Sequence, residues 1–165
     1  MAKKISIKDL ETISVQHLEW YELDYWVARA EGIKHPPAMR EMEPGFVMVP
    51  VIGSDDDGSY TTYAIYSPTS NWNQGGEILY REKIGLDTWQ GDWAAQFAHP
   101  RDIPEEKFSP SHCRMRGDTP LIAAMRTYVA FKFGQYFTPT DDGGTTVAER
   151  PERPKFKPLK QSSED

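Results

Sequence analysis

The chain has 165 residues, of which 38% are hydrophobic and 12% aromatic, and it carries a formal net charge of −6 at pH 7. This length provides one domain with a substantial core, and the acidic balance argues against a protein that binds along a nucleic-acid backbone. The single cysteine, Cys113, excludes an internal disulfide framework and favours a reducing cytoplasm, and no apolar run approaches the ~20 residues of a membrane-spanning helix.

The first two elements expected along the chain are a short strand and an amphipathic helix. Residues 4–8 alternate between apolar and polar side chains, which predicts the strand. From Val15 to Glu31 apolar residues recur at spacings of three and four, and Gly32 follows as a stop signal. This pattern predicts a helix that packs on a sheet.

Two β-rich segments follow, at 46–52 and 60–66, and they flank a polar turn with three consecutive aspartates at 55–57. Together they predict an antiparallel hairpin. The aspartates lack the alternating ligands of a calcium loop, so the interpretation is a solvated turn. Pro50 has no amide hydrogen, so the first strand is predicted to lie at an edge or to be bulged there.

The middle of the chain gives shorter signals. Helix formers between Glu77 and Ile84, closed by Gly85, predict a short second helix. Residues 92–97 predict another strand, whereas residues 99–116 contain three prolines and scattered charges and predict a long excursion without regular structure.

The helix signals agree best after Gly117. Asp118 or Thr119 is the expected N-cap, Pro120 occupies the first helical position, and Gly134 lies past the end. A wide apolar stripe predicts a main core element. Its members are Leu121, Ile122, Met125, Tyr128, Val129 and Phe133; Arg126 and Lys132 lie off it.

Residues 138–165 contain many prolines, charges and polar residues, with a basic stretch at 150–160. Such a segment buries too little apolar surface to offset the entropy of ordering it. We therefore predict one α+β domain over residues 1–137, with a small antiparallel sheet packed by two to three helices. Residues 138–165 are predicted to form a flexible, disordered tail.

Residues 66–76 form the candidate recognition loop, at the point where a predicted strand is followed by a predicted helix. This segment combines an aromatic ring with hydroxyls, amides and paired glycines. If Ser70 or Asn73 caps that helix, the amides of residues 74–76 face an anion. Trp72 can stack on a ring of the ligand, and the polar side chains of the loop can form hydrogen bonds with the donors and acceptors of the ligand. The candidate ligand-binding residues here are Tyr66, Ser67, Thr69, Asn71, Trp72, Asn73, Gln74, Gly75 and Gly76.

Three further candidates lie elsewhere in the chain. Trp93 offers another ring, and Arg114 and Arg116 can supply cations to an anionic ligand. The structural alternative stays open for all these residues. In that alternative the residues of the loop serve only to form a turn, and Trp72 is a core residue. The two glycines then allow a tight strand-to-helix connection, and the arginines belong to a solvated loop.

Motifs for common chemistries are missing from the sequence. The four histidines are far apart, so the residue pattern predicts no metal site. There is no G-x-S-x-G elbow, no phosphate-binding loop and no dinucleotide fingerprint. We therefore assign no catalytic residue and no cofactor.

Three segments carry a family resemblance: LDYWVARAEG at 23–32, YSPTSNWNQGG at 66–76, and TPLIAAMR at 119–126 running on to KFG at 132–134. Together they resemble the NinX-like family of small bacteriophage proteins, over roughly residues 3–135. The stretches 36–44 and 104–110 and the tail depart from it. The resemblance implies a phage protein acting in the host bacterial cytoplasm, and it implies no activity or catalytic residues.

The leading hypothesis is a non-enzymatic phage accessory protein that binds a small nucleotide-like ligand and so sequesters a host immune signal. The first alternative is a protein-protein inhibitor or adaptor that acts on a host enzyme through the tail or an exposed aromatic surface. The second is a small hydrolase or transferase, which would need carboxylates such as Asp24 and Glu77 to converge. A sheet edge and many aromatics also leave room for a homo-oligomer.

Overall fold

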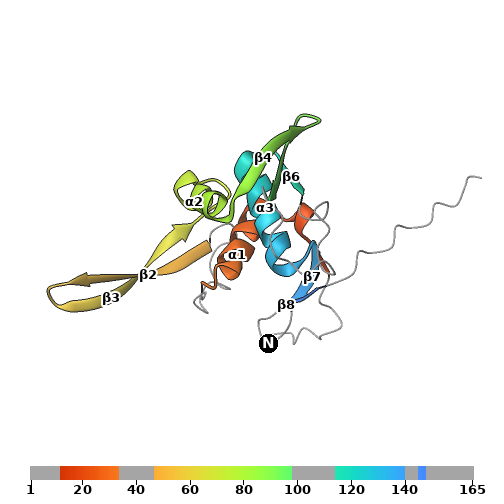
Figure 1. Cartoon of the computed structure of the whole chain (residues 1–165). Helices are drawn as coiled ribbons and strands as arrows, with labels where there is room; N and C mark the ends of the chain where they lie inside the picture. Colours follow the sequence, from red (N-terminus) through yellow and green to blue (C-terminus); the bar gives the residue numbers. More distant parts are fainter. Residues whose placement is uncertain (1–11, 34–46, 98–113, 140–144, 148–165) are drawn as a thin grey trace, which may run out of the picture.

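The computed structural model describes residues 12–33, 47–97, 114–139 and 145–147 (Figure 1). In these ranges the chain forms three α-helices and three small antiparallel sheets, which confirms the α+β class. The helical segments are α1 (Trp20–Ala30), α2 (Trp72–Glu82), α3 (Pro120–Phe133) and a 3₁₀ turn, η2 (Val15–His17). The sheets have the orders β1-β7-β8, β2-β3 and β4-β5-β6. Their strands are β1 (Ile13–Ser14), β2 (Val47–Asp55), β3 (Gly58–Tyr66), β4 (Ile84–Trp89), β5 (Asp92–Phe97), β6 (Met115–Gly117), β7 (Tyr136–Pro139) and β8 (Thr145–Val147).

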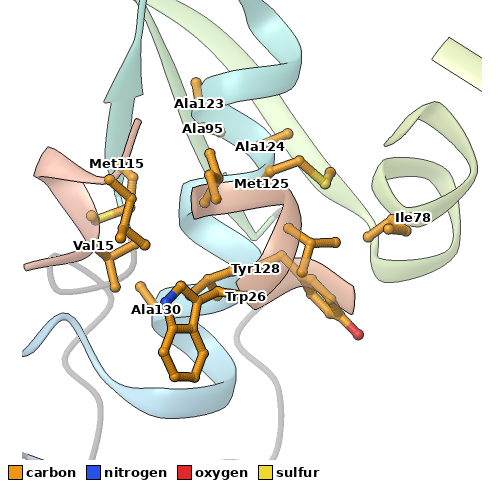
Figure 2. Packing of buried hydrophobic residues seen from close by; sticks show 14 of the residues in the cluster. Val15, Trp26, Ile78, Ala95, Met115, Ala123, Ala124, Met125, Tyr128 and Ala130 are labelled. Atoms are coloured by element: carbon orange, nitrogen blue, oxygen red, sulfur yellow. The ribbon is translucent and has the colours of Figure 1, made fainter. Parts of the chain in front are cut away.

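Helix α3 lies at the centre of the core, as its sequence predicts. The Thr119 hydroxyl caps it by accepting a hydrogen bond from the Ile122 amide at 3.2 Å, Pro120 is the first helical residue, and Gly134 follows the last turn. Tyr128 and Met125 are fully buried. Helices α1 and α2 and the β4-β5-β6 sheet pack on different sides of α3 (Figure 2). This helix therefore organises the whole fold.

Helix α1 begins later than the periodicity predicts. Residues from Val15 to His17 form the 3₁₀ turn, and the regular helix starts at Trp20. A capping box explains the start, because the Glu19 amide donates to the Glu22 carboxylate at 3.1 Å and the Glu19 side chain accepts from the Glu22 amide. The predicted start at Val15 was wrong because capping, which periodicity does not record, sets the boundary.

Strands β2 and β3 form the predicted hairpin, which projects from the body as a two-stranded arm (Figure 1). Its register runs without interruption from Val47 opposite Tyr66 to Asp55 opposite Gly58. Pro50 lies opposite Tyr63 with no bulge, and the prediction of an edge strand is confirmed. Only the base of the arm, at Val47 and Tyr66, is buried.

Helix α2 and the sheet after it differ most from the sequence predictions. The helix runs from Trp72 to Glu82, ahead of the predicted 77–84, and ends at Lys83 in a left-handed conformation with φ of 57°. The predicted strand at 92–97 is confirmed as β5. Strand β4 was not predicted from the sequence, because its extended conformation depends on its pairing with β5. Strand β6 was missed because it is only three residues long.

The third sheet joins the two ends of the described chain. β7 pairs with β1 on one side and with β8 on the other. Thr138, Pro139 and residues 145–147 thus form strands within the range predicted as a flexible tail. The rest of that range, the strand predicted at 4–8 and most of the excursion at 99–116 lie outside the described residues. No helix in the described part of the chain is long and apolar enough to cross a membrane.

Candidate functional site

The connection from β3 to α2 is a tight, hydrogen-bonded turn. The amides of Ser70 and Asn71 both donate to the Ser67 carbonyl, at 3.0 and 2.8 Å. Asn71 is the N-cap of α2, because its Oδ1 accepts from the Asn73 amide at 3.0 Å. The predicted caps, Ser70 and Asn73, were therefore wrong by one and two positions.

The amides expected to face an anion make hydrogen bonds inside this turn. Those of Gln74 and Gly75 donate to the Asn71 carbonyl, at 3.1 and 2.9 Å. The Gln74 side chain also acts within the protein: its Oε1 accepts from the Ser67 amide at 2.7 Å and its Nε2 donates to the Ile65 carbonyl at 3.1 Å. Ligand contacts at this turn would therefore have to come from other side chains.

The two glycines have different surroundings. A Cβ atom on Gly75 would lie 2.1 Å from the Pro68 carbonyl oxygen and 3.0 Å from Leu121 Cδ2, so only glycine lets α2 approach the turn and α3 this closely. A Cβ atom on Gly76 would lie 3.2 Å from the Trp72 ring. The Trp72 ring thus extends over Gly76.

Helix α2 presents an aromatic face to solvent. Trp72, Gly76 and Tyr80 follow at four-residue intervals, which places them on one side of a helix. Trp72 is 56% exposed and Tyr80 is 75% exposed. The Lys83 ammonium lies 4.3 Å from the centre of the Tyr80 ring. We name Trp72, Gly76, Tyr80 and Lys83 the α2 face.

Beneath the turn lies a buried carboxyl group that the sequence did not single out as a partner of the loop. Asp24 on α1 is 2% exposed, and its Oδ1 accepts from the Thr69 amide at 2.9 Å. Burial raises the pKa of Asp24 to about 6, against the opposing effect of its hydrogen bond from the Thr69 amide. Asp24 therefore fixes the loop to helix α1.

A second polar group joins the C-terminal end of α1 to α2 and α3. Glu31 accepts two hydrogen bonds from Arg81, with Nη2–Oε1 at 2.6 Å and Nη1–Oε2 at 3.1 Å, and a short one from the Tyr128 hydroxyl. Burial alone would raise the pKa of Glu31, but these partners lower it. Burial also raises the pKa of Tyr66, and the charges of Glu31 and Asp24 add to that rise. The sequence offered no signal for this network, because Glu31, Arg81 and Tyr128 are far apart in the chain.

Tyr128→Phe tests this network. The substitution leaves the apolar packing in place but removes one donor from a half-buried carboxylate, so we expect a loss of about 1.5–3 kcal/mol in the free energy of unfolding. Urea titration measures it. Tyr80→Phe, on the exposed face of α2, should change stability little, and equal losses in both variants would contradict the assignment.

The other predicted ligand residues lie on the β4-β5-β6 sheet. Trp93 is partly buried against the hydrophobic core and lies opposite Gly117, which faces α3. Arg116 is paired with Ala94 and so lies on the other face of this sheet. There Arg114 sits 4.9 Å above the Trp89 ring and 3.4 Å from the Asp87 carboxylate. The ring of Trp93 and the two arginines are thus on opposite faces.

The carboxylates named for a hydrolase also occupy different environments. Asp24 is buried under Thr69, whereas Glu77 is exposed on α2. Both raise the pKa of Tyr66, but a substrate could reach Asp24 only by displacing the turn. Among the described residues, no group of three histidine, cysteine or acidic side chains is placed to hold a metal ion.

A family model matches most of the chain. The model of a family described as Bacteriophage P22, NinX matches residues 14–132. That range covers α1, α2 and all but the last residue of α3, and it includes the 66–76 turn, Asp24 and Glu31. No curated protein matches the chain.

Proposed function

Because this chain belongs to the NinX family of bacteriophage proteins, we propose that it is a non-enzymatic accessory protein that binds a small nucleotide-like ligand in the host cytoplasm. The ligand in this proposal is a signal of host defence, and binding sequesters it. The function needs a surface for a planar ring and polar groups beside it, and no chemical step.

The exposed α2 face is the observation that carries the proposal. Large rings are usually more buried than Trp72 and Tyr80 are. Because the Trp72 ring extends over Gly76, a flat ligand would stack on the solvent-facing side of that ring, with Tyr80 one helical turn further along. Every nucleobase offers a π surface to such rings.

Polar groups border this face and match a nucleotide. Asn73 is exposed in the first turn and Glu77 in the second, so their side chains can meet the donors and acceptors of a base or ribose. Lys83 supplies a cation next to Tyr80 for a phosphate. The ligand would lie along α2, because the amides at the start of the helix are engaged in the turn.

Calorimetry and thermal shift against a panel of cyclic nucleotides and adenosine-ribose compounds test the proposal. We expect at least one compound to bind and to raise the melting temperature. Trp72→Ala should weaken that binding by roughly 5- to 150-fold, the range that corresponds to the loss of one stacked base. Tyr80→Ala should weaken it as well.

Trp20→Ala is the matched control, because Trp20 is similarly exposed but lies on α1. It should leave affinity unchanged. The absence of binding to every compound, or affinity that survives the loss of both Trp72 and Tyr80, would contradict the proposal. Mass spectrometry of the denatured, freshly purified protein would reveal a co-purified ligand outside the panel.

A further inference from the structure

The β2-β3 arm exposes large apolar side chains to solvent. Ile52 is 79% exposed, and about half of Tyr63 and Ile65, on the same face of the hairpin, is exposed. Tyr60, on the other face, lies over Gly53 and is half exposed. An isolated two-stranded hairpin is marginally stable in water, and a contiguous exposed apolar surface marks an interaction site. The arm is therefore the strongest candidate for an interface, independently of the α2 face.

The register of the arm shows which backbone groups point outward. In a hairpin with a two-residue turn, the residue pair next to the turn exchanges backbone hydrogen bonds. Further along the strands, pairs that are hydrogen-bonded to each other alternate with pairs whose backbone groups point outward. That pair is Asp55 and Gly58, so Pro50 and Tyr63 form an outward-facing pair. The position without an amide hydrogen thus lies on the free edge of β2. This proline obstructs strand addition there.

The free edge of β3 has no such obstruction. Its outward-facing residues are the alternate positions Ser59, Thr61, Tyr63 and Ile65. All four carry an amide hydrogen and a carbonyl oxygen that point away from β2. Threonine, tyrosine and isoleucine are also favourable strand residues. The edge of β3 is therefore a ready template for one more strand.

We propose that this strand is β3 of a second copy, which pairs antiparallel about a two-fold axis at Thr62. In this register Thr61 pairs with Tyr63 and Ser59 pairs with Ile65 of the other copy, so all four outward residues on each edge are used. The two arms then form a four-stranded sheet. Because the axis makes the interface self-complementary and Pro50 obstructs both outer edges, assembly stops at the dimer.

Charge at the turns favours this arrangement over a parallel one. Each turn carries Asp55, Asp56 and Asp57. Antiparallel pairing about Thr62 separates the two turns by roughly 35 Å, several times the Debye length of about 8 Å at physiological salt. Parallel pairing would place six carboxylates together. The acidic turns therefore select the two-fold arrangement.

Sedimentation equilibrium of the full chain across a concentration series tests the dimer. Wild type should approach twice the 18.9 kDa chain mass with increasing concentration. Thr61→Pro removes a central outward amide of β3 and should shift the protein to the monomer. Ile52→Pro is the matched control, because Ile52 lies directly opposite Thr61 on the other edge, and it should leave the dimer intact. Circular dichroism confirms that both variants fold.

A wild-type monomer at every concentration would overturn the proposal and leave the edge to a strand of a host protein. Equal dissociation of the two proline variants would overturn it too. A cross-link tests the register: Thr62→Cys, with Cys113→Ser, places two thiols at the axis with Cβ atoms about 5 Å apart, and oxidation should give a disulfide-linked dimer. Ser54→Cys, on the obstructed edge, should not. Failure of Thr62→Cys to cross-link would exclude this register.

Discussion

Gly75→Ala is expected to lower the free energy of unfolding by about 3 kcal/mol or more, although alanine is the better helix former by about 1 kcal/mol. The added methyl group would lie 2.1 Å from the Pro68 carbonyl oxygen, a backbone atom of a buried residue. Helix α2 would have to move away from the turn to relieve this contact. Movement would also weaken the two hydrogen bonds of the Gln74 side chain. Urea unfolding measures the loss.

Gly76→Ala is the matched control, one residue further along the same helix. Its methyl group would lie 3.2 Å from the Trp72 ring, which is exposed and can shift. The gain in helix propensity then offsets the crowding, so stability should change by less than about 1 kcal/mol. A Gly75→Ala protein as stable as Gly76→Ala would show that the turn is looser than the structure indicates.

The parts of the fold that the sequence predicts are those with short-range signals. For α3, the cap at Thr119, the proline at 120 and the glycine at 134 lie within one helix and agree with each other. The β2-β3 hairpin is equally local, since its strands are joined by a two-residue turn. In such segments neighbouring residues determine the structure, so sequence patterns suffice.

Predictions failed where distant residues determine the element. For α2 the local cap was misplaced, because Ser70 or Asn73 was expected and Asn71 caps the helix. The packing of Gly75 against Leu121, which lies far along the chain, could not be predicted from neighbouring residues. Strand β4 extends along β5, and β6 is completed by its pairing with Trp93, Ala94 and Ala95. Neither interaction has a counterpart in local composition.

The candidate site divides in the same way. The sequence located the strand-to-helix connection, but it left open whether Trp72 is a core residue or a ligand platform; the structure shows that Trp72 is exposed. The sequence could not show that Gln74 holds the turn, that Asp24 binds Thr69 from 45 positions away, or that Glu31 meets Tyr128 from 97 positions away. These contacts depend on the packing of α1, α2 and α3, and they explain why the turn is rigid while the α2 face stays accessible.

Asp24 should make the protein more stable as pH falls from 8 toward 5. Its folded-state pKa of about 6 lies above the ordinary 3.8, so the folded protein binds this proton more tightly than the unfolded chain does. The resulting stability is fully present below pH 3.8 and is lost as pH rises through 6. The full difference is about 3 kcal/mol, of which roughly 1 kcal/mol falls between pH 5 and 8.

The contribution of Glu31 to stability has the opposite pH dependence, and it changes at lower pH. Because its pKa is lowered by Arg81 and Tyr128, it contributes stability above its ordinary pKa of 4.5 that is lost under more acidic conditions. The two contributions therefore oppose each other mainly below pH 4.5, where the gain in stability from Asp24 should level off or reverse. Thermal melts from pH 3 to pH 8 would show this change of slope.

Asp24→Asn isolates the contribution of the buried carboxyl group. Asparagine keeps an oxygen for the Thr69 amide and carries no charge, so the variant should be roughly 1–3 kcal/mol more stable than wild type at pH 8. Its stability should also vary less between pH 5 and 8. Asp56→Asn, at the exposed turn of the arm, should keep the wild-type dependence. If Asp24→Asn showed the same change of stability between pH 5 and 8 as wild type, another group would be responsible for it. Ionisation of the buried Asp24 carboxyl group would then not destabilise the protein.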